Sequence, residues 1–251
     1  MQDIFGHKQN DTYLIIRFVM LYLVPTPIGN LEDMTFRAIN VLNECDVILS
    51  EDTRTSGKLL KHFNIDKPLW SFHAFNEHKA LKNIIDHLQQ GKKMALISDA
   101  GTPGISDPGY LLVRECQAHD IKVSCLPGAT AFVPALVSSG MTTDKFYFEG
   151  FLPHKKGRQT RWRYLSQLDV TIILYESPHR LMKCLEEVKE YLGEDRRVCV
   201  AREISKVFEE FNTRSVIDAI TYYTAKPAKG EIVLVIEGRT KQSKNASDDE
   251  D

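Results

Sequence analysis

The amino-acid sequence predicts an α/β protein built from two domains, each with a sheet flanked by helices. Short apolar runs of strand type alternate with amphipathic stretches of helix type along most of the chain. Polar or glycine-rich loops follow several of these runs, as in α/β proteins that bind ligands at the carboxyl ends of their strands. The length of 251 residues and the hydrophobic content of 43% suffice for one large or two small domains.

The first half of the chain predicts an open, largely parallel sheet. Asp33 can cap the first helix, and Gly91 ends an amphipathic helix that begins at Glu77. The expected strands are 21–24, 47–49, 94–97 and 123–126, and the expected helices follow Asp33, pass through 59–63, cover 77–90 and 110–119, and end near Gly140.

The second half repeats the α/β pattern after a polar and basic stretch at 152–163. Ser177 followed by Pro178 is typical of a helix start. The expected strands are 146–151, 171–175, 198–201, 208–213 and 232–237, and the expected helices are 178–192 and 215–224. We therefore expect residues 20–142 to form an N-terminal α/β domain and residues 143–239 a C-terminal α/β domain.

The two ends of the chain lie outside these domains. Residues 1–19 are an expected N-terminal extension without a signal-peptide cleavage site, and either Met1 or Met20 could be the start. Residues 240–251 are an acidic tail that we expect to be disordered. Without the four final acids the net charge of −2 becomes +2, so the body has no global basic field.

Cysteine usage indicates a cytoplasmic protein. The five cysteines are scattered, odd in number and without a C-x-x-C pair, which favours reduced, buried thiols over disulfides. His73, His78 and His87 form no metal-ligand pattern, and we expect no metal site. The apolar patch at 18–24 is too short to span a bilayer, so no membrane is expected as a partner.

The loop at 98–109 is the most informative stretch. Its twelve residues, SDAGTPGISDPG, hold three glycines, two prolines and two aspartates between an expected strand and an expected helix. Such connections usually take about two to six residues, so this length favours a small-molecule site over a simple tight connection. Similar loops follow other strands, and parallel strands would bring them to one edge as a composite site. These loops are 25–30, 50–55, 98–109, 127–130 and 176–180.

Six ordered motifs across residues 20–239 resemble a bacterial family, the small-subunit ribosomal RNA cytidine 2′-O-methyltransferases of the tetrapyrrole methylase superfamily. They are LVPTPIGNL (23–31), SEDTR (50–54), SDAGTPGISDPG (98–109), FEGFLP (148–153), YESPHR (175–180) and GEIV (230–233). The chain departs from the family at Gly104, where a larger residue is usual, and at 127–130, where PGAT replaces PGPS. Residues 1–19 lie outside the family pattern.

The resemblance implies a two-domain tetrapyrrole-methylase-like fold in which each domain is an open mixed sheet flanked by helices. It also implies S-adenosylmethionine as cofactor, a homodimer, and 2′-O-methylation of a cytidine ribose in the 16S rRNA of the small ribosomal subunit. The cofactor contacts that it implies are Pro25, Asp99, Gly101, Thr102, Ile105, Thr130, Ala131, Tyr175 and Gly230.

A ribose hydroxyl is a poor nucleophile near neutral pH. The enzyme must therefore position it in line with the methyl group and assist the removal of its proton. The expected catalytic residues are Asp52, Asp99 and Arg54, with Glu51 and Glu176 as further candidate bases. Each acid could instead cap a loop or form an ion pair with an arginine.

RNA contact is expected in segment 155–163, which carries five cations and Trp162. The expected RNA-binding residues are Lys155, Lys156, Arg158 and Arg161. The alternative is a solvated helix start with the tryptophan in the core.

Two other functions are compatible with the sequence. One is a methyltransferase acting on a tetrapyrrole-like small molecule, which would share the fold and cofactor. The other is a ribosome-associated binding protein without catalytic activity. The basic segment favours RNA over the first, and the acids that follow the strands favour an enzyme over the second.

Overall fold

The computed structural model describes residues 21–239 and divides the chain into two compact units, with the boundary between Thr130 and Ala131. The expected N-terminal extension and acidic tail lie outside the described residues. The boundary falls earlier than the expected one at residue 142, because helix α6 (Phe132–Ser138) contacts strand β10 (Ile232–Ile236) of the second unit. The hydroxyl of Thr213 also donates a hydrogen bond to the carbonyl of Ser139 at 2.9 Å.

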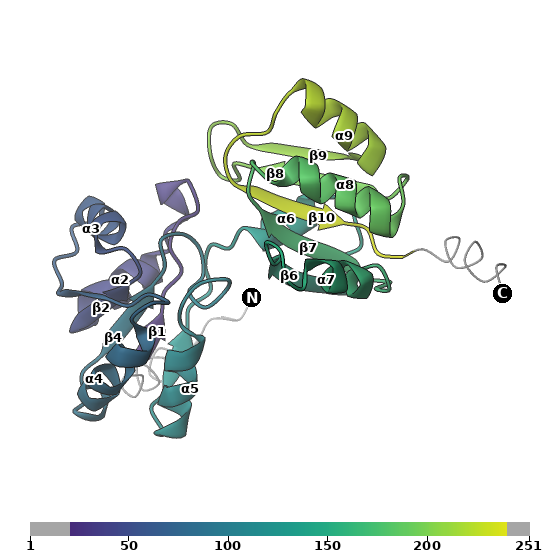
Figure 1. The fold of residues 1–251 in the computed structure, drawn as a ribbon. Helices are drawn as coiled ribbons and strands as arrows, with labels where there is room; N and C mark the ends of the chain where they lie inside the picture. Colours follow the sequence, from purple (N-terminus) through teal and green to yellow (C-terminus); the bar gives the residue numbers. More distant parts are fainter. Residues whose placement is uncertain (1–20, 240–251) are drawn as a thin grey trace, which may run out of the picture. The chain divides into compact units, whose positions relative to one another are not determined.

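The first unit contains a five-stranded sheet in the order β3-β2-β4-β1-β5, and all its pairings are parallel (Figure 1). Its strands are β1 (Leu21–Leu23), β2 (Val47–Ser50), β3 (Leu69–Ser71), β4 (Met94–Ile97) and β5 (Val123–Cys125). The apolar pattern does not predict β3, because this strand has three residues, lies at the sheet edge and is partly exposed.

Helices cover both faces of this sheet. Helices α2 (Phe36–Glu44) and α3 (Thr53–His62) pack with Tyr22 and Ile48 on one face. Helices α4 (Glu77–Gln89) and α5 (Tyr110–Ala118) pack with Leu21 and Val47 on the other face. The neighbouring strands β1 and β4 therefore send their loops to opposite faces, which makes their carboxyl ends a topological switch point. Open α/β sheets bind ligands at such points.

The second unit contains a mixed five-stranded sheet in the order β6-β7-β10-β8-β9. Strand β6 is parallel to β7, whereas the other pairings are antiparallel. Helices α7 (Arg158–Leu165), α8 (Leu181–Leu192) and α9 (Val216–Ala225) share one apolar core with this sheet. The remaining strands are β6 (Phe146–Phe151), β7 (Thr171–Glu176), β8 (Arg197–Arg202) and β9 (Glu210–Ser215). The predicted two-domain α/β class is confirmed.

Two predicted helix starts are wrong. Asp33 belongs to a short 3₁₀ turn, η1 (Leu31–Asp33), and Thr35 caps α2 by accepting a hydrogen bond from the Ala38 N–H at 3.1 Å. Helix α8 begins at Leu181 instead of Pro178, because residues 177–180 form a turn closed by the Arg180 N–H and the Ser177 carbonyl at 2.9 Å. None of the helices in residues 21–239 is long and apolar enough to cross a membrane.

Candidate functional site

The loops that follow β1 and β4 are joined at the switch point of the first sheet. Thr26 and Gly101 exchange two backbone hydrogen bonds, each 2.9 Å long. The hydroxyl of Thr26 is buried and donates to the Ser98 carbonyl at 3.0 Å. Gly101 has a φ of +83°, a conformation that glycine adopts without the strain imposed on other residues. The predicted loop is therefore an ordered structure at the carboxyl edge of the sheet.

The loop that follows β5 contacts the same assembly. The Thr102 hydroxyl donates to the Ala129 carbonyl at 3.0 Å. A Cβ atom on Gly128 would lie 2.6 Å from the side chain of Pro25, so only glycine permits this approach. The structure thus brings together the loops that carry Pro25, Thr102 and the other cofactor residues predicted in the first unit. Ile105 keeps 36% of its surface exposed at this edge.

Three of the predicted cofactor residues belong to the second unit. Ala131 precedes helix α6, and Tyr175 lies on β7, edge-on to the rings of Phe148 and Phe151 at 5.2 and 5.5 Å. Gly230 has a φ of +84° and directly precedes the segment leading into β10. The positive φ favours glycine at this position, and a Cβ atom there would also require the side chain of Glu203 to move.

Arg54 engages the carboxylate of Asp52. Its Nε and Nη2 donate to Asp52 Oδ1 and Oδ2 at 3.0 and 2.6 Å, and its backbone N–H donates to Oδ1 at 2.9 Å. These bonds lower the pKa of Asp52 to about 2. Asp99 accepts a hydrogen bond from the Asp52 N–H at 3.3 Å, and burial raises the pKa of its carboxyl. Asp99 is therefore the more basic of the two predicted acids.

Asp107 is a further acid of this site, and it is not among the candidate bases that the sequence predicts. Burial, followed by the charges of Glu51 and Asp99, raises the pKa of Asp107 to about 6. Burial and the charge of Asp99 also raise the pKa of Glu51. Asp107 lies near the C-terminal end of the long loop. The fold of this loop brings Asp107 close enough to Glu51 and Asp99 for their charges to affect its pKa. Its presence in the same twelve-residue motif as Asp99 was the available signal.

Replacement of Asp107 with asparagine is expected to stabilise the protein at pH 8 and to change little below pH 4. Because the folded-state pKa is raised to about 6 from an unfolded value of 3.8, the folded state binds the proton more tightly. Stability contributed by this group is thus lost as the pH rises through that window. Thermal melting of both proteins between pH 4 and 8 measures the difference; a gain that is equal at all pH values would contradict the assignment.

The basic segment divides into buried and exposed cations. Arg158 is 4% exposed, and its guanidinium contacts Glu187 at 2.6 Å and Glu176 at 3.5 Å. It therefore holds α7 against α8, and its burial contradicts the prediction that Arg158 binds RNA. The guanidinium of Arg161 forms an ion pair with Glu149 and donates a hydrogen bond to the Tyr147 hydroxyl at 2.8 Å.

Trp162 and Glu176 are also structural. Trp162 is fully buried and stacks on Tyr191 with a centroid distance of 6.3 Å, so it belongs to the core. Glu176 is 4% exposed, and its carboxylate accepts hydrogen bonds from the Ser177 N–H at 2.8 Å and from Arg180 at 2.7 Å. Lys155 and Lys156 are exposed and form no salt bridge within the part of the chain that the structure describes. No group of three or more His, Cys, Asp or Glu residues in the described part could hold a metal ion.

Comparison with known proteins gives consistent matches over most of the chain. The family model of the tetrapyrrole (corrin/porphyrin) methylases matches residues 20–220. A Synechocystis protein named ribosomal RNA small subunit methyltransferase I is 49% identical over 92% of this chain and 83% of its own length. A Thermotoga maritima protein of the same name is 46% identical over 87% of this chain and 98% of its own length.

Solved structures give the same fold. The uroporphyrin-III-C-methyltransferase of Thermus thermophilus superposes with a TM-score of 0.59 at 19% identity, covering 86% of this chain and 93% of that chain. A cobalt precorrin-4 methyltransferase superposes with a TM-score of 0.63 at 17% identity, with the same two coverages of 86% and 93%.

Proposed function

Because this chain belongs to the tetrapyrrole methylase family and is a methyltransferase, we propose that it methylates ribosomal RNA of the small subunit with S-adenosylmethionine. More specifically, the acceptor is the 2′-hydroxyl of a cytidine ribose in 16S rRNA. The observation that carries this proposal is the 49% identity, over 92% of the chain, to a protein named as such a methyltransferase. We further propose that it acts in the cytoplasm as a homodimer.

The residues at the switch point fit the proposed cofactor. S-adenosylmethionine carries a cationic sulfonium from which a methyl group is transferred, and carboxylates stabilise such a charge. Glu51, Asp99 and Asp107 provide carboxylates at this edge. Tight loops around Gly101 offer backbone groups for close contact, and Ile105 offers an exposed apolar surface. Pro25, Thr102 and Thr130 complete the cofactor contacts that we assign to the first unit.

Asp99 and Asp107 are the proposed proton acceptors for the ribose hydroxyl. Both carboxyls have raised pKa values because of burial, which makes them stronger bases than an ordinary aspartate. The Asp52–Arg54 pair has a different role. Its carboxylate is held by the guanidinium at 2.6 Å, so we assign it to positioning Asp99 through the Asp52 N–H.

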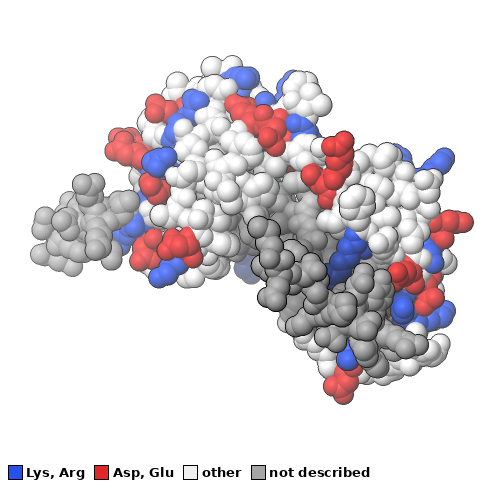
Figure 2. All heavy atoms as spheres, turned by 180° about the vertical axis from the view of Figure 1, so that it is seen from behind, with Lys and Arg blue, Asp and Glu red and all other residues white. Residues whose placement is uncertain are grey.

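RNA binding is expected to depend on local clusters of cations, because Figure 2 shows charges of both signs interspersed on the visible face. Replacement of Lys155 and Lys156 with alanine should weaken binding to small subunits. If each lysine contacts one phosphate, the slope of log affinity against log salt should flatten by roughly 1.4, following about 0.7 per contact with single-stranded nucleic acid.

The measurement is binding between 50 and 200 mM salt, with Lys79→Ala and Lys82→Ala on α4 as a matched pair of exposed lysines. An unchanged slope in the Lys155 and Lys156 variant, or an equal change in the α4 variant, would show that this segment is an ordinary solvated surface.

A methylation assay tests the function directly. The purified protein and labelled S-adenosylmethionine are offered naked 16S rRNA, assembled small subunits or a tetrapyrrole precursor. Label in RNA that blocks alkaline cleavage at one cytidine supports ribose 2′-O-methylation. Label in the precursor alone establishes the small-molecule activity instead. Binding to small subunits without any label points to a non-catalytic ribosome-associated protein.

A further inference from the structure

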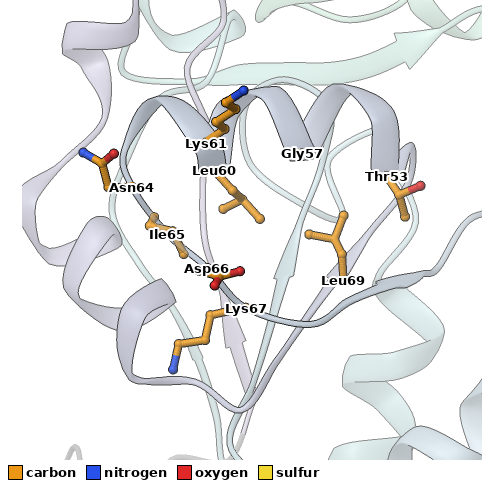
Figure 3. Close-up of a pocket in the computed structure, with 9 residues that line it drawn as sticks. All are labelled: Thr53, Gly57, Leu60, Lys61, Asn64, Ile65, Asp66, Lys67 and Leu69. Atoms are coloured by element: carbon orange, nitrogen blue, oxygen red, sulfur yellow. The ribbon is translucent and has the colours of Figure 1, made fainter.

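A pocket of about 570 Å³ lies in the first unit, between helix α3 and the segment that leads into β3 (Figure 3). Ligand pockets commonly measure about 300–1,000 Å³, so this one can admit a small organic group. Leu60 and Leu69 point toward one another across it, and Lys61 and Lys67 lie at its margins. The lining residues are Thr53, Gly57, Leu60, Lys61, Asn64, Ile65, Asp66, Lys67 and Leu69.

Gly57 occupies the interior of α3 although nothing in the fold requires a glycine there. Its φ is not positive, and a Cβ atom added to it would meet no atom within 4 Å. Glycine in a helix interior makes the helix less stable than alanine does. No contact within the described fold compensates for this loss of stability. A group that lies against the helix from outside would account for the missing side chain.

The charged side chains around the pocket are available to bind a ligand. Within residues 21–239, Asp66, Lys61 and Lys67 form no salt bridge and no side-chain hydrogen bond, although opposite charges share the pocket. Leu60 and Ile65 are buried at 4% and 5% exposure and provide an apolar wall. The pocket thus combines an apolar wall, one carboxylate acceptor and two cations at its margins.

This combination matches a nucleotide of single-stranded RNA. An unstacked base packs on apolar surface, and an aspartate accepts a hydrogen bond from an exocyclic amino group such as that of cytosine. Lysines at the margin suit the flanking phosphates. The pocket is also adjacent to the candidate site. Thr53 lines the pocket, and it directly follows Asp52, which lies after the carboxyl end of β2.

We propose that the pocket between α3 and β3 binds one unstacked, amino-bearing base of the RNA substrate, with Asp66 accepting a hydrogen bond from that amino group. The inference rests on the proposed function, because it assumes an RNA substrate. It adds a second RNA contact on the first unit, separate from Lys155 and Lys156 of the second.

The test fills the pocket with Gly57→Leu, which replaces glycine with a strong helix former. Single-stranded 16S rRNA fragments and assembled small subunits serve as probes. We expect affinity for both to fall roughly tenfold, within the usual effect of losing one base contact, and KM to rise while kcat changes little. Affinity for S-adenosylmethionine alone should stay the same. Asn40→Leu, at an exposed position of α2, is the control for an added leucine.

Asp66→Ala tests the base recognition. The parent should bind an oligocytidine more tightly than an oligouridine of the same length, and the variant should lose that preference. Equal binding by the parent and Gly57→Leu overturns the inference, as does a loss seen only with assembled subunits, which would indicate a ribosomal protein in the pocket. If the parent binds no RNA at all, the proposed function itself fails.

Discussion

Asparagine in place of Asp99 or of Asp107 is expected to slow a single turnover of methyl transfer by about 10²–10⁴-fold, the usual contribution of a general base. Both substitutions keep the size of the side chain but remove its basicity. The loop should keep its fold, because the Thr26–Gly101 backbone bonds hold it, and affinity for RNA should change little. Affinity for S-adenosylmethionine should fall modestly, because one carboxylate near the sulfonium is lost. The rate is measured with both ligands saturating, so that binding does not contribute.

Asp52→Asn provides the comparison. Since Arg54 lowers the pKa of Asp52 to about 2, this carboxylate is a weak base and its loss should cost less than the loss of Asp99. The parent rate should also rise with pH and level off above about 6, the pKa of Asp107. Near-normal rates for Asp99→Asn and Asp107→Asn would leave positioning as the mechanism, with the proton passing to water or Glu51.

Valine in place of Gly101 is expected to abolish binding of S-adenosylmethionine while the protein remains folded. A β-branched residue is a strained choice at a φ of +83°, and the added Cβ would also contact Ile28 at 3.5 Å. Relief of this strain requires the backbone to rotate and to break the paired bonds with Thr26. A cost of about 1–3 kcal/mol is smaller than the usual stability of a domain. Calorimetric titration measures the affinity, and circular dichroism follows unfolding.

Gly140→Val is the matched control for strain. Gly140 also has a positive φ, +71°, but a Cβ atom there would meet nothing within 4 Å. It should lose comparable stability and keep its cofactor affinity. Unchanged binding by Gly101→Val, or equal loss in both variants, would remove the assignment of loop 98–109 to the cofactor.

Local patterns were sufficient to predict most of the fold. Buried strands such as β4 and β10 are continuous apolar runs, and the long loop after β4 stands out by its glycines and prolines. The same patterns could not identify β3, whose three residues are too few to show a period. They also misplaced the start of α8, because the turn at 177–180 is held by a contact between Arg180 and Glu176.

The site was less predictable, because its chemistry depends on partners far apart in the sequence. Arg158 looks like a surface cation until the fold brings Glu187, 29 residues away, against it. Asp52 and Asp99 look equivalent in the sequence, yet among residues 21–239 the guanidinium of Arg54 forms its hydrogen bonds with Asp52. Burial sets the basicity of Asp107, and no spacing of residues encodes it.

The strand order β3-β2-β4-β1-β5 also sets the sequence of events while the chain is being synthesised. Strand β1 is made first, yet its hydrogen-bonding neighbours are β4 and β5, whose residues Met94 and Val123 pair with Leu21. Pairing of such distant segments is slow, because a long loop must close before it forms. The apolar residues of β1 therefore emerge from the ribosome without a partner, and β1, which lies between β4 and β5, is among the last strands of the first unit to be paired on both sides.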